Sequence, residues 1–269
     1  MSAIDSDRTQ EESLKYVSVK KMSKQKWANQ VVSVVNEMAI TVFLNGKEIV
    51  TLLCTGLHLK ALAVGFLHSE GLIHRRNDIQ EITVDEKKGQ VHVTARKEAV
   101  IEEKPPRKRT VASGCGQGIV FYPADALIDH KVESSLTLNS DQVFFLMSQL
   151  TQQSELYRKT RGVHNSALAS HEGIIFFHSD IGRHNAVDMI CGSSFLENIS
   201  LEDKILLTTG RITSEILLKV AKIRIPLLIS RNVATYHAIS LAQSIGITLV
   251  GDVRGTKFVV YSHPERVNK

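Results

Sequence analysis

The alternation of strand-like and helix-like segments after residue 138 constrains the fold more than any other feature of this sequence. Short apolar runs that are typical of buried strands occur at residues 163–169, 174–178, 205–208, 226–230, 247–251 and 258–261. Apolar residues with helical spacing precede the first run and separate several of the others. Strand–helix–strand alternation predicts an α/β fold whose C-terminal lobe has three layers, with helices on both faces of a sheet.

The N-terminal third has a different pattern, with mostly strand-like segments and one helix. An Asn45-Gly46 pair between two apolar runs indicates a β-hairpin, and a second hairpin is predicted to turn near residues 88–90. Between them, apolar residues from Leu59 to Leu67 repeat with helical spacing, and Gly71 is placed to end that helix. We therefore expect a smaller, β-rich N-terminal lobe.

Changes in composition divide the chain into four parts. Residues 1–25 are expected to form a disordered tail, and residues 26–101 the β-rich lobe. A charged stretch with two prolines opens a linker, residues 102–138, which carries Cys115 among glycines. The α/β lobe then spans residues 139–269.

The sequence argues against several classes of protein. The N-terminus is polar and no apolar run approaches the length of a membrane-spanning helix, so we expect a cytoplasmic protein without membrane contact. Cys54, Cys115 and Cys191 are too far apart to indicate a disulfide framework or a zinc site. Residues 68–70, His-Ser-Glu, match half of a zinc deaminase signature, but no Pro-Cys-x-x-Cys follows, so no metal site is predicted.

The charge balance is mildly basic. The chain has 33 Lys and Arg against 28 Asp and Glu, a formal net charge of +5. This excess favours a phosphate-bearing small molecule or an acidic partner protein, and it fits a basic surface without a partner equally well. It is too small to predict binding to nucleic acid.

Cys115 is the candidate reactive residue. Gly114 and Gly116 flank it and three basic residues, 107–109, precede it. Nearby cations and backbone N–H groups favour the thiolate, which is the nucleophilic form of cysteine. The alternative is an unreactive loop cysteine. We interpret Cys54 and Cys191 as packing residues.

Three loops that follow predicted strands combine glycine with basic residues: residues 180–188, 208–211 and 252–257. Backbone N–H groups at a helix N-terminus, together with an arginine, are suited to an anion. The loops are therefore candidate sites for a polyanionic ligand, with a capped helix N-terminus and a plain hairpin as alternatives. The candidate ligand-binding residues are Arg183, His184, Gly210, Arg211, Asp252, Val253, Arg254, Gly255, Thr256 and Lys257.

Three local details concern this region. In the alternative for the first loop, Asp180 or Asn185 would cap the helix that starts there. Glu215 and Lys219 have the spacing of an ion pair on one helix face. His164 lies in a strand-like segment, where a structural role and a role in the site are equally compatible with the sequence.

Six segments occur in the order that one family would have. They are LAVGFLHSEG at 62–71, SGCGQG at 113–118, TRGVHNSALAS at 160–170, DIGRHNAVDMICG at 180–192, TTGRITSEILLK at 208–219 and LVGDVRGTKFVVYSHPER at 249–266. Together they resemble the FdhD family, the formate dehydrogenase accessory sulfurtransferases. The resemblance extends from about residue 31 to residue 266.

The resemblance implies a fold and a function. The C-terminal lobe would be similar to the cytidine deaminase fold without its zinc, in a cytoplasmic homodimer. The protein would take sulfur from a cysteine desulfurase as a persulfide on Cys115. It would pass that sulfur to the molybdenum (or tungsten) bis-guanine-dinucleotide cofactor of formate dehydrogenase. The loop of residues 252–257 would hold the guanine-dinucleotide end, for which GDP is an analogue, and we expect all three loops to converge on its pyrophosphate.

The chain departs from the family pattern at one position. Gly118 stands where many members have a second cysteine, so the persulfide cannot be resolved through a disulfide within the loop. A relay through Cys115 alone remains chemically complete. The alternative is a non-covalent chaperone that binds the molybdenum cofactor and delivers it to formate dehydrogenase. A nucleotide hydrolase or deaminase lacks the necessary metal ligands or a Ser/His/Asp arrangement.

Overall fold

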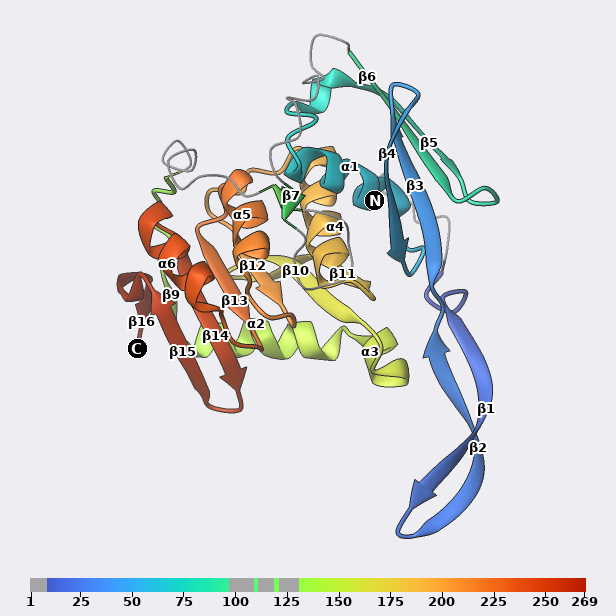
Figure 1. Cartoon of the computed structure of the whole chain (residues 1–269). Coiled ribbons are helices and arrows are strands. Elements are labelled where there is room, and N and C mark those ends of the chain that lie inside the picture. Colours follow the sequence, from blue (N-terminus) through green and yellow to red (C-terminus); the bar gives the residue numbers. More distant parts are fainter. Residues whose placement is uncertain (1–8, 97–108, 111–118, 121–130) are drawn as a thin grey trace.

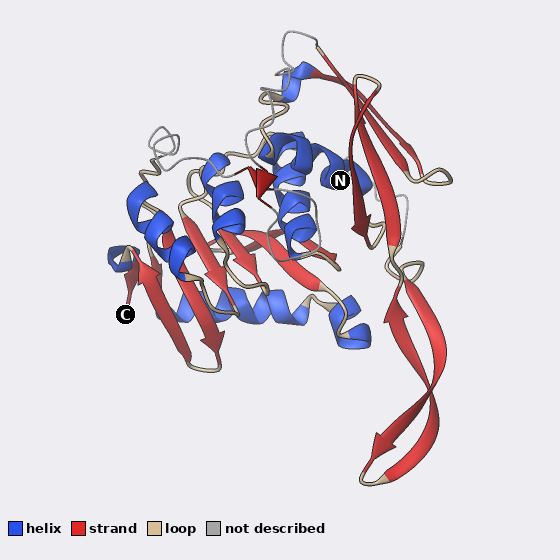
Figure 2. Cartoon of the chain, viewed as in Figure 1, coloured by secondary structure: helices blue, strands red, loops and turns tan. Residues whose placement is uncertain are grey.

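The protein has two lobes and a projecting ribbon, shown in Figures 1 and 2. The structure is a computed structural model that describes residues 9–96, 109–110, 119–120 and 131–269. In this part of the chain, no helix is long and apolar enough to cross a membrane.

A six-stranded sheet forms the centre of the C-terminal lobe. Its strands lie in the order β11 (Gly173–Asp180), β10 (His164–Ser170), β12 (Ile205–Thr208), β13 (Leu227–Ser230), β14 (Thr248–Arg254) and β15 (Lys257–Ser262). β12, β13 and β14 are parallel, whereas β10 is antiparallel to both of its neighbours and β15 is antiparallel to β14. The carboxyl ends of β11, β12, β13 and β14 therefore share one edge, called the carboxyl edge below.

Helices cover both faces of this sheet, as the sequence predicts. Ala167, Leu207 and Ile229 pack in the core beneath α2 (Ser140–Gln152). Their neighbours Leu168, Leu206 and Leu228 point to the opposite face, which α4 (Arg183–Leu196), α5 (Ser214–Lys222) and α6 (Tyr236–Ile245) cover. The α/β class and the three layers are thus confirmed. Asn139 caps α2 by accepting a hydrogen bond from the Gln142 backbone N–H at 2.8 Å.

The N-terminal lobe is a four-stranded sheet with one helix. The strand order is β4 (Lys47–Cys54), β3 (Met38–Leu44), β6 (Gln90–Ala95) and β5 (Ile79–Asp85), and the helix is α1 (Leu59–Ser69). Asn45 and Gly46 turn the first hairpin with φ of 51° and 78°, and Gly71 follows α1 with φ of 78°. These are the turn and the helix end that the sequence predicts.

Two glycines bring the lobes together. A Cβ atom on Gly65 of α1 would lie 1.7 Å from the Asp188 carbonyl oxygen of α4. One on Gly192 of α4 would lie 1.8 Å from the Ala61 carbonyl oxygen of α1. No side chain fits at either position, so α1 and α4 are in backbone contact.

The ribbon, called the arm below, consists of β1 (Leu14–Ser23) and β2 (Lys26–Val35). The two strands pair from Leu14↔Val35 to Ser23↔Lys26 without a bulge. The expectation of a disordered tail over residues 1–25 is therefore wrong from residue 14 onward, while residues 1–8 lie outside the described residues. The lysines give this segment the composition of a polar tail, and its two-residue turn, Lys24-Gln25, lacks the glycine or asparagine that signals a hairpin.

Shorter elements complete the described chain. They are η1 (Arg76–Asp78), β7 (Arg109–Thr110) paired with β8 (Ile119–Val120), β9 (Leu138–Asn139) paired with β16 (Val267–Asn268), α3 (Glu155–Thr160) and η4 (Pro264–Arg266).

Candidate functional site

Cys115 and Gly118 lie outside the described residues. The chain on either side of residues 111–118 is described, and it forms an antiparallel pair in which Arg109 lies opposite Val120 and Thr110 opposite Ile119. The two ends of this segment are therefore neighbours in space.

The first two predicted loops meet at the carboxyl edge. A Cβ atom on Gly210 would lie 3.1 Å from the Cβ of Arg183, so the glycine makes room for the arginine. The Gly210 carbonyl accepts a hydrogen bond from the Ser230 hydroxyl at 2.6 Å, which fixes the loop to the end of β13. The structure thus brings Arg183, His184, Gly210 and Arg211 into one region, as predicted.

This region is strongly basic. Burial lowers the pKa of His164, and the charges of Arg183, His184 and Arg211 lower it further. His164 therefore belongs to the same region, at the first residue of β10. The carboxylate that offsets these charges is that of Glu215 in the first turn of α5, whose Oε2 lies 2.7 Å from the Nε2 of His184.

Two buried donors point to an anionic ligand. Within the described residues, the Nε of Arg183 and the Oγ1 of Thr213 are buried and have no hydrogen-bond partner. Thr213 is the N-cap residue of α5, but its side chain makes no capping hydrogen bond. Leaving buried donors unpaired costs free energy, which an anion at the helix N-terminus would recover. The residues at this edge therefore fit a phosphate group.

Asn165, a buried polar residue of β10, holds two of these segments together. Asn165 accepts a hydrogen bond from the Ser179 hydroxyl at 2.6 Å, and its backbone N–H donates to the Thr209 hydroxyl at 3.0 Å. It therefore ties β11 to the loop after β12. Sequence reasoning missed Asn165, although it lies within the RGVHNSA segment.

Asp180 joins the site to the N-terminal lobe. Its carboxylate accepts hydrogen bonds from the Thr55 backbone N–H at 2.8 Å, from the Gly182 N–H at 2.9 Å and from the Asn185 side chain at 2.7 Å. Burial raises the pKa of this carboxyl, and the hydrogen bonds oppose the effect. The N-cap of α4 is Gly182 and no side chain caps the helix, so the alternative of a helix N-terminus capped by Asp180 or Asn185 does not hold. The Asp180 side chain turns toward Thr55 instead.

The third predicted loop, residues 252–257, lies at the same edge but farther along it. β13 separates β14 from β12, so these two strands lie about 10 Å apart, two strand spacings. Arg254 lies 2.9 Å from Asp252 within the loop, and Val253 is buried in the core beneath α2, so its side chain cannot contact a ligand. The loop borders an open depression of about 610 Å³ together with Ser140 and Phe144 of α2.

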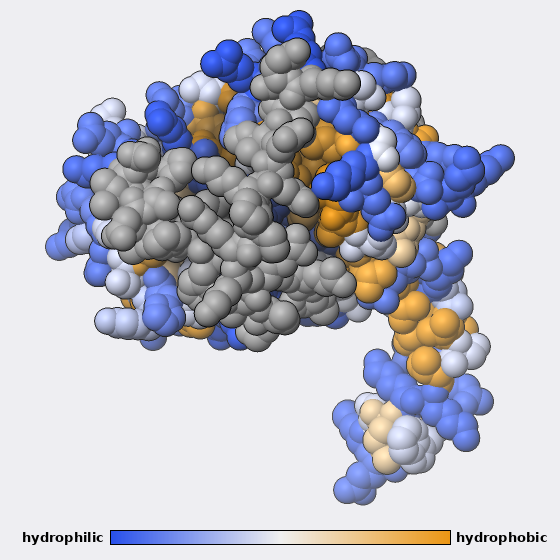
Figure 3. Space-filling model, turned by 45° about the horizontal axis from the view of Figure 1, so that its top comes forward, coloured by the Kyte–Doolittle hydropathy of each residue, from blue (hydrophilic) through white to orange (hydrophobic). Residues whose placement is uncertain are grey.

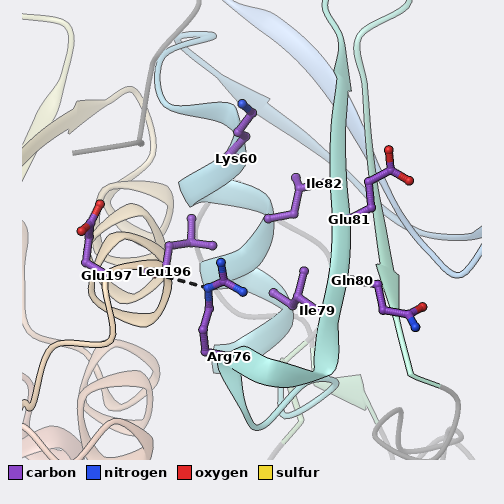
Figure 4. Close-up of a pocket in the computed structure, with 8 residues that line it drawn as sticks. All are labelled: Lys60, Arg76, Ile79, Gln80, Glu81, Ile82, Leu196 and Glu197. Atoms are coloured by element: carbon purple, nitrogen blue, oxygen red, sulfur yellow. Dashed lines mark hydrogen bonds between the residues drawn. The ribbon is translucent and has the colours of Figure 1, made fainter. Parts of the chain in front are cut away.

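A second depression, of about 240 Å³, lies at the junction of the lobes (Figure 4). Arg76 donates a hydrogen bond to the Leu196 carbonyl there at 3.3 Å, and Lys60 and Glu197 also border it. Leu196 ends α4 whereas Arg183 begins it, about 20 Å away along a helix of 14 residues. This depression is therefore separate from the candidate site.

The predicted Glu215–Lys219 ion pair is wrong. Lys219 turns inward, with its Nζ 2.8 Å from Asp188 Oδ1 and 2.8 Å from the Ser69 hydroxyl. Burial alone would lower the pKa of Lys219, but the carboxylates of Asp188 and Glu70 raise it. The buried Asp188 needs a counter-charge, and this leaves Glu215 free to pair with His184.

The two described cysteines are packing residues, as expected. Cys54 and Cys191 are both buried. Burial and the neighbouring Asp188 raise the pKa of the Cys191 thiol to about 12, which makes it unreactive at neutral pH. His68 and Glu70, from the partial deaminase signature, contact the Ile73 carbonyl and Lys219. No group of three metal-ligating side chains occurs among the described residues.

Comparisons with known proteins agree on one family. The model of the FdhD/NarQ family matches residues 35–268. A sulfur carrier protein FdhD from Bacillus subtilis (strain 168) is 40% identical over 236 residues, which cover 87% of this chain and 90% of the relative. The protein of the same name from Staphylococcus aureus (strain MRSA252) is 39% identical, covering 87% and 88%.

A solved structure has the same fold. The crystal structure of a protein described as a formate dehydrogenase accessory protein from Desulfotalea psychrophila superposes with a TM-score of 0.78 at 25% identity. The match covers 94% of this chain and 99% of that one.

Proposed function

Because the chain belongs to the FdhD/NarQ family, we propose that it is a sulfurtransferase that carries sulfur as a persulfide on Cys115. The relatives that it resembles are named sulfur carrier proteins. The observation that carries the assignment to Cys115 is the burial of the other two cysteines of the chain, Cys54 and Cys191.

The chemistry needs one nucleophilic sulfur. The Cys115 thiolate attacks the terminal sulfur of a persulfide on a cysteine desulfurase. The sulfur–sulfur bond of the donor breaks, its cysteine leaves as a thiolate, and a new sulfur–sulfur bond forms on Cys115. In the later delivery step, that bond breaks with its electron pair left on Cys115, which restores the thiolate. The outer sulfur leaves as a zero-valent atom, and the acceptor supplies the electron pair of its new bond to sulfur. The sequence supplies basic residues 107–109 near the thiolate, and no second thiol takes part.

The acceptor in this proposal is the molybdenum (or tungsten) bis-guanine-dinucleotide cofactor of a formate dehydrogenase. This cofactor is cargo and is phosphate-rich. The unpaired Nε of Arg183 and the uncapped N-terminus of α5 support phosphate binding at the carboxyl edge, with Arg211 and His184 beside them. Residues 252–257 would bind a second part of the same ligand, two strands away. We further propose a cytoplasmic homodimer.

Mass spectrometry tests the sulfur-carrier function. The protein is incubated with a cysteine desulfurase and L-cysteine without reductant, and digested. The expected result is one added sulfur atom on the peptide with Cys115 and none in a Cys115→Ala variant. An unmodified protein that still binds GDP would overturn this proposal in favour of the non-covalent cofactor chaperone.

A further inference from the structure

The arm exposes apolar residues along its whole length. Tyr16, Trp27 and Val31 are 68%, 66% and 62% exposed, and Met22 is 50% exposed. Figure 3 shows apolar residues along the arm, where it projects from the body. A two-stranded ribbon that stands alone is marginally stable in water, and exposed apolar patches of this kind mark interaction sites.

The arm also carries the entire excess charge of the protein. Its lysines are Lys15, Lys20, Lys21, Lys24 and Lys26, and it contains no Asp or Glu. Removing these five from the 33 Lys and Arg leaves 28, against 28 Asp and Glu, so the rest of the chain is formally neutral.

The pairing of the two strands determines which face of the arm each of these side chains occupies. Residues directly opposite each other share a face, so Met22 and Trp27 lie together with the Ser18↔Val31 and Tyr16↔Ser33 pairs. Lys15, Lys21 and Lys26 belong to the other face, together with the partly exposed Val17 and Val34, whereas Lys20 lies on the face of Trp27. Near the turn, Lys20 and Trp27 border an open hollow of about 610 Å³. An apolar and aromatic face bordered by cations fits an apolar surface with acidic residues around it.

The root of the arm is fixed beside the candidate site. Leu14 and Val35 belong to a small core with Val163 and Ile181. Val163 directly precedes His164, and Ile181 is two residues from Arg183. The Ser13 hydroxyl also donates a hydrogen bond to the Thr55 carbonyl at 3.1 Å. Because each strand has ten residues, a partner lying along about 33 Å of arm would reach the carboxyl edge.

We propose that the arm docks an acidic surface of the formate dehydrogenase that receives the cofactor; this rests on the function proposed above. Two arms facing each other would oppose five lysines with five lysines, and the neutral body offers no excess of acidic charge. A bilayer would favour apolar residues at the tip alone, whereas here they extend to the root. The family model begins at residue 35, where the arm ends, so the arm lies outside the residues that this model matches.

Binding to the formate dehydrogenase that this protein activates in cells tests the proposal. The enzyme is prepared without cofactor, and the Cys115→Ala background removes sulfur transfer from the measurement. One variant carries Lys20→Glu, Lys21→Glu, Lys24→Glu and Lys26→Glu, and another carries Met22→Ser and Trp27→Ser. A third replaces residues 18–31 by Asn-Gly and keeps the four root pairs. The control for charge carries four exposed substitutions outside the arm, Lys87→Glu, Lys88→Glu, Lys131→Glu and Lys269→Glu, and changes the net charge by the same amount.

We expect the Kd of each arm variant to be at least tenfold larger than that of the wild type, and the Kd of the control to be unchanged. The wild-type Kd is expected to rise with salt concentration. Circular dichroism and unchanged GDP binding verify the fold of each variant. Persulfide loading of the same arm variants with Cys115 present tests the proposed function separately. Wild-type affinity in folded arm variants would overturn the proposal. So would arm-dependent binding to anionic phospholipid vesicles, to RNA or to a second copy of the chain in place of the enzyme.

Discussion

Gly210 and Arg183 face each other at the carboxyl edge, where a Cβ atom on the glycine would lie 3.1 Å from the arginine Cβ and 3.3 Å from its Cδ. The two residues come from loops that follow strands β12 and β11. Because β10 lies between these strands in the sheet, the contact depends on both loops reaching over the first residues of β10.

Replacing Gly210 by valine is expected to displace Arg183. The larger side chain needs the volume that the arginine stem occupies, so the Arg183 side chain is displaced from the candidate site. We expect GDP to bind about tenfold more weakly, a loss of about 1.4 kcal/mol. Titration calorimetry measures this, and thermal unfolding controls for stability. GDP binding with wild-type affinity by a folded Gly210→Val protein would place the phosphate elsewhere.

Charge reversal at Arg254 tests the distant loop. Arg254 is paired with Asp252 and its side chain is 67% exposed, so it is accessible to a ligand. Arg254→Glu is expected to weaken GDP binding by about tenfold through loss of a charge-assisted contact. Persulfide loading of Cys115 is expected to stay unchanged. Calorimetry and the loading assay measure the two effects, and an unaltered GDP affinity would remove residues 252–257 from the site.

The sequence predicts the α/β lobe well because apolar periodicity is a local property. Residues 205–208 coincide with β12. The predicted hairpin turn is formed by Asn45 and Gly46, two residue types that tolerate the positive φ angles found there. The loops at the carboxyl edge follow from the same pattern. Their mutual contacts do not, since the spatial order β11, β10, β12 is not the order of the chain.

Tertiary contacts account for the errors. Glu215 and Lys219 have the right spacing to pair, but a buried Asp188 on another helix takes the lysine. Gly65 and Gly192 look like ordinary helix residues in the sequence, and only the crossing of α1 and α4 explains why neither position can carry a side chain. The first strand of the arm, β1, falls in the stretch for which the sequence predicts disorder, because the lysines of this strand mask the alternation of its valines.

Stability is expected to fall as the pH is lowered from 7.5 to 5.5. Burial, and then the neighbouring His58, hold the pKa of His178 well below 6.5. In the unfolded chain this pKa is near 6.5, so the unfolded state binds more protons as pH falls and becomes favoured. Burial shifts the pKa of His58, His68 and His164 in the same direction.

Urea unfolding of the wild type and of His178→Gln at both pH values measures this effect. The variant is expected to lose less stability on acidification than the wild type. Asp180 acts in the opposite direction, because burial raises its pKa, but the comparison with the variant cancels its contribution. Equal losses in the two proteins would show that His178 does not contribute.

The Asp188–Lys219 pair is expected to contribute strongly to stability. The two side chains are 2% and 11% exposed, so Asp188→Asn leaves a buried cation with only the half-buried Glu70, 3.4 Å away, as counter-charge. We expect a loss of about 3 kcal/mol in the free energy of unfolding. The double variant Asp188→Leu with Lys219→Met is expected to recover more than half of it. Asp203→Asn breaks an exposed pair with Lys204 and should cost less than about 1 kcal/mol. Equal effects of the two single variants in urea unfolding would contradict this ranking.

The three cysteines are expected to differ in reactivity. Iodoacetamide at neutral pH should modify Cys115 in the folded protein and reach Cys54 and Cys191 only after unfolding, because both are buried and the pKa of Cys191 is raised to about 12. Peptide mapping by mass spectrometry measures the pattern. In cells, Cys115→Ala is expected to abolish formate dehydrogenase activity with the fold intact. Cys191→Ser should retain that activity and lose stability, since it places a hydroxyl in an apolar core. Full formate dehydrogenase activity with Cys115→Ala would end the persulfide hypothesis, whatever the labelling shows.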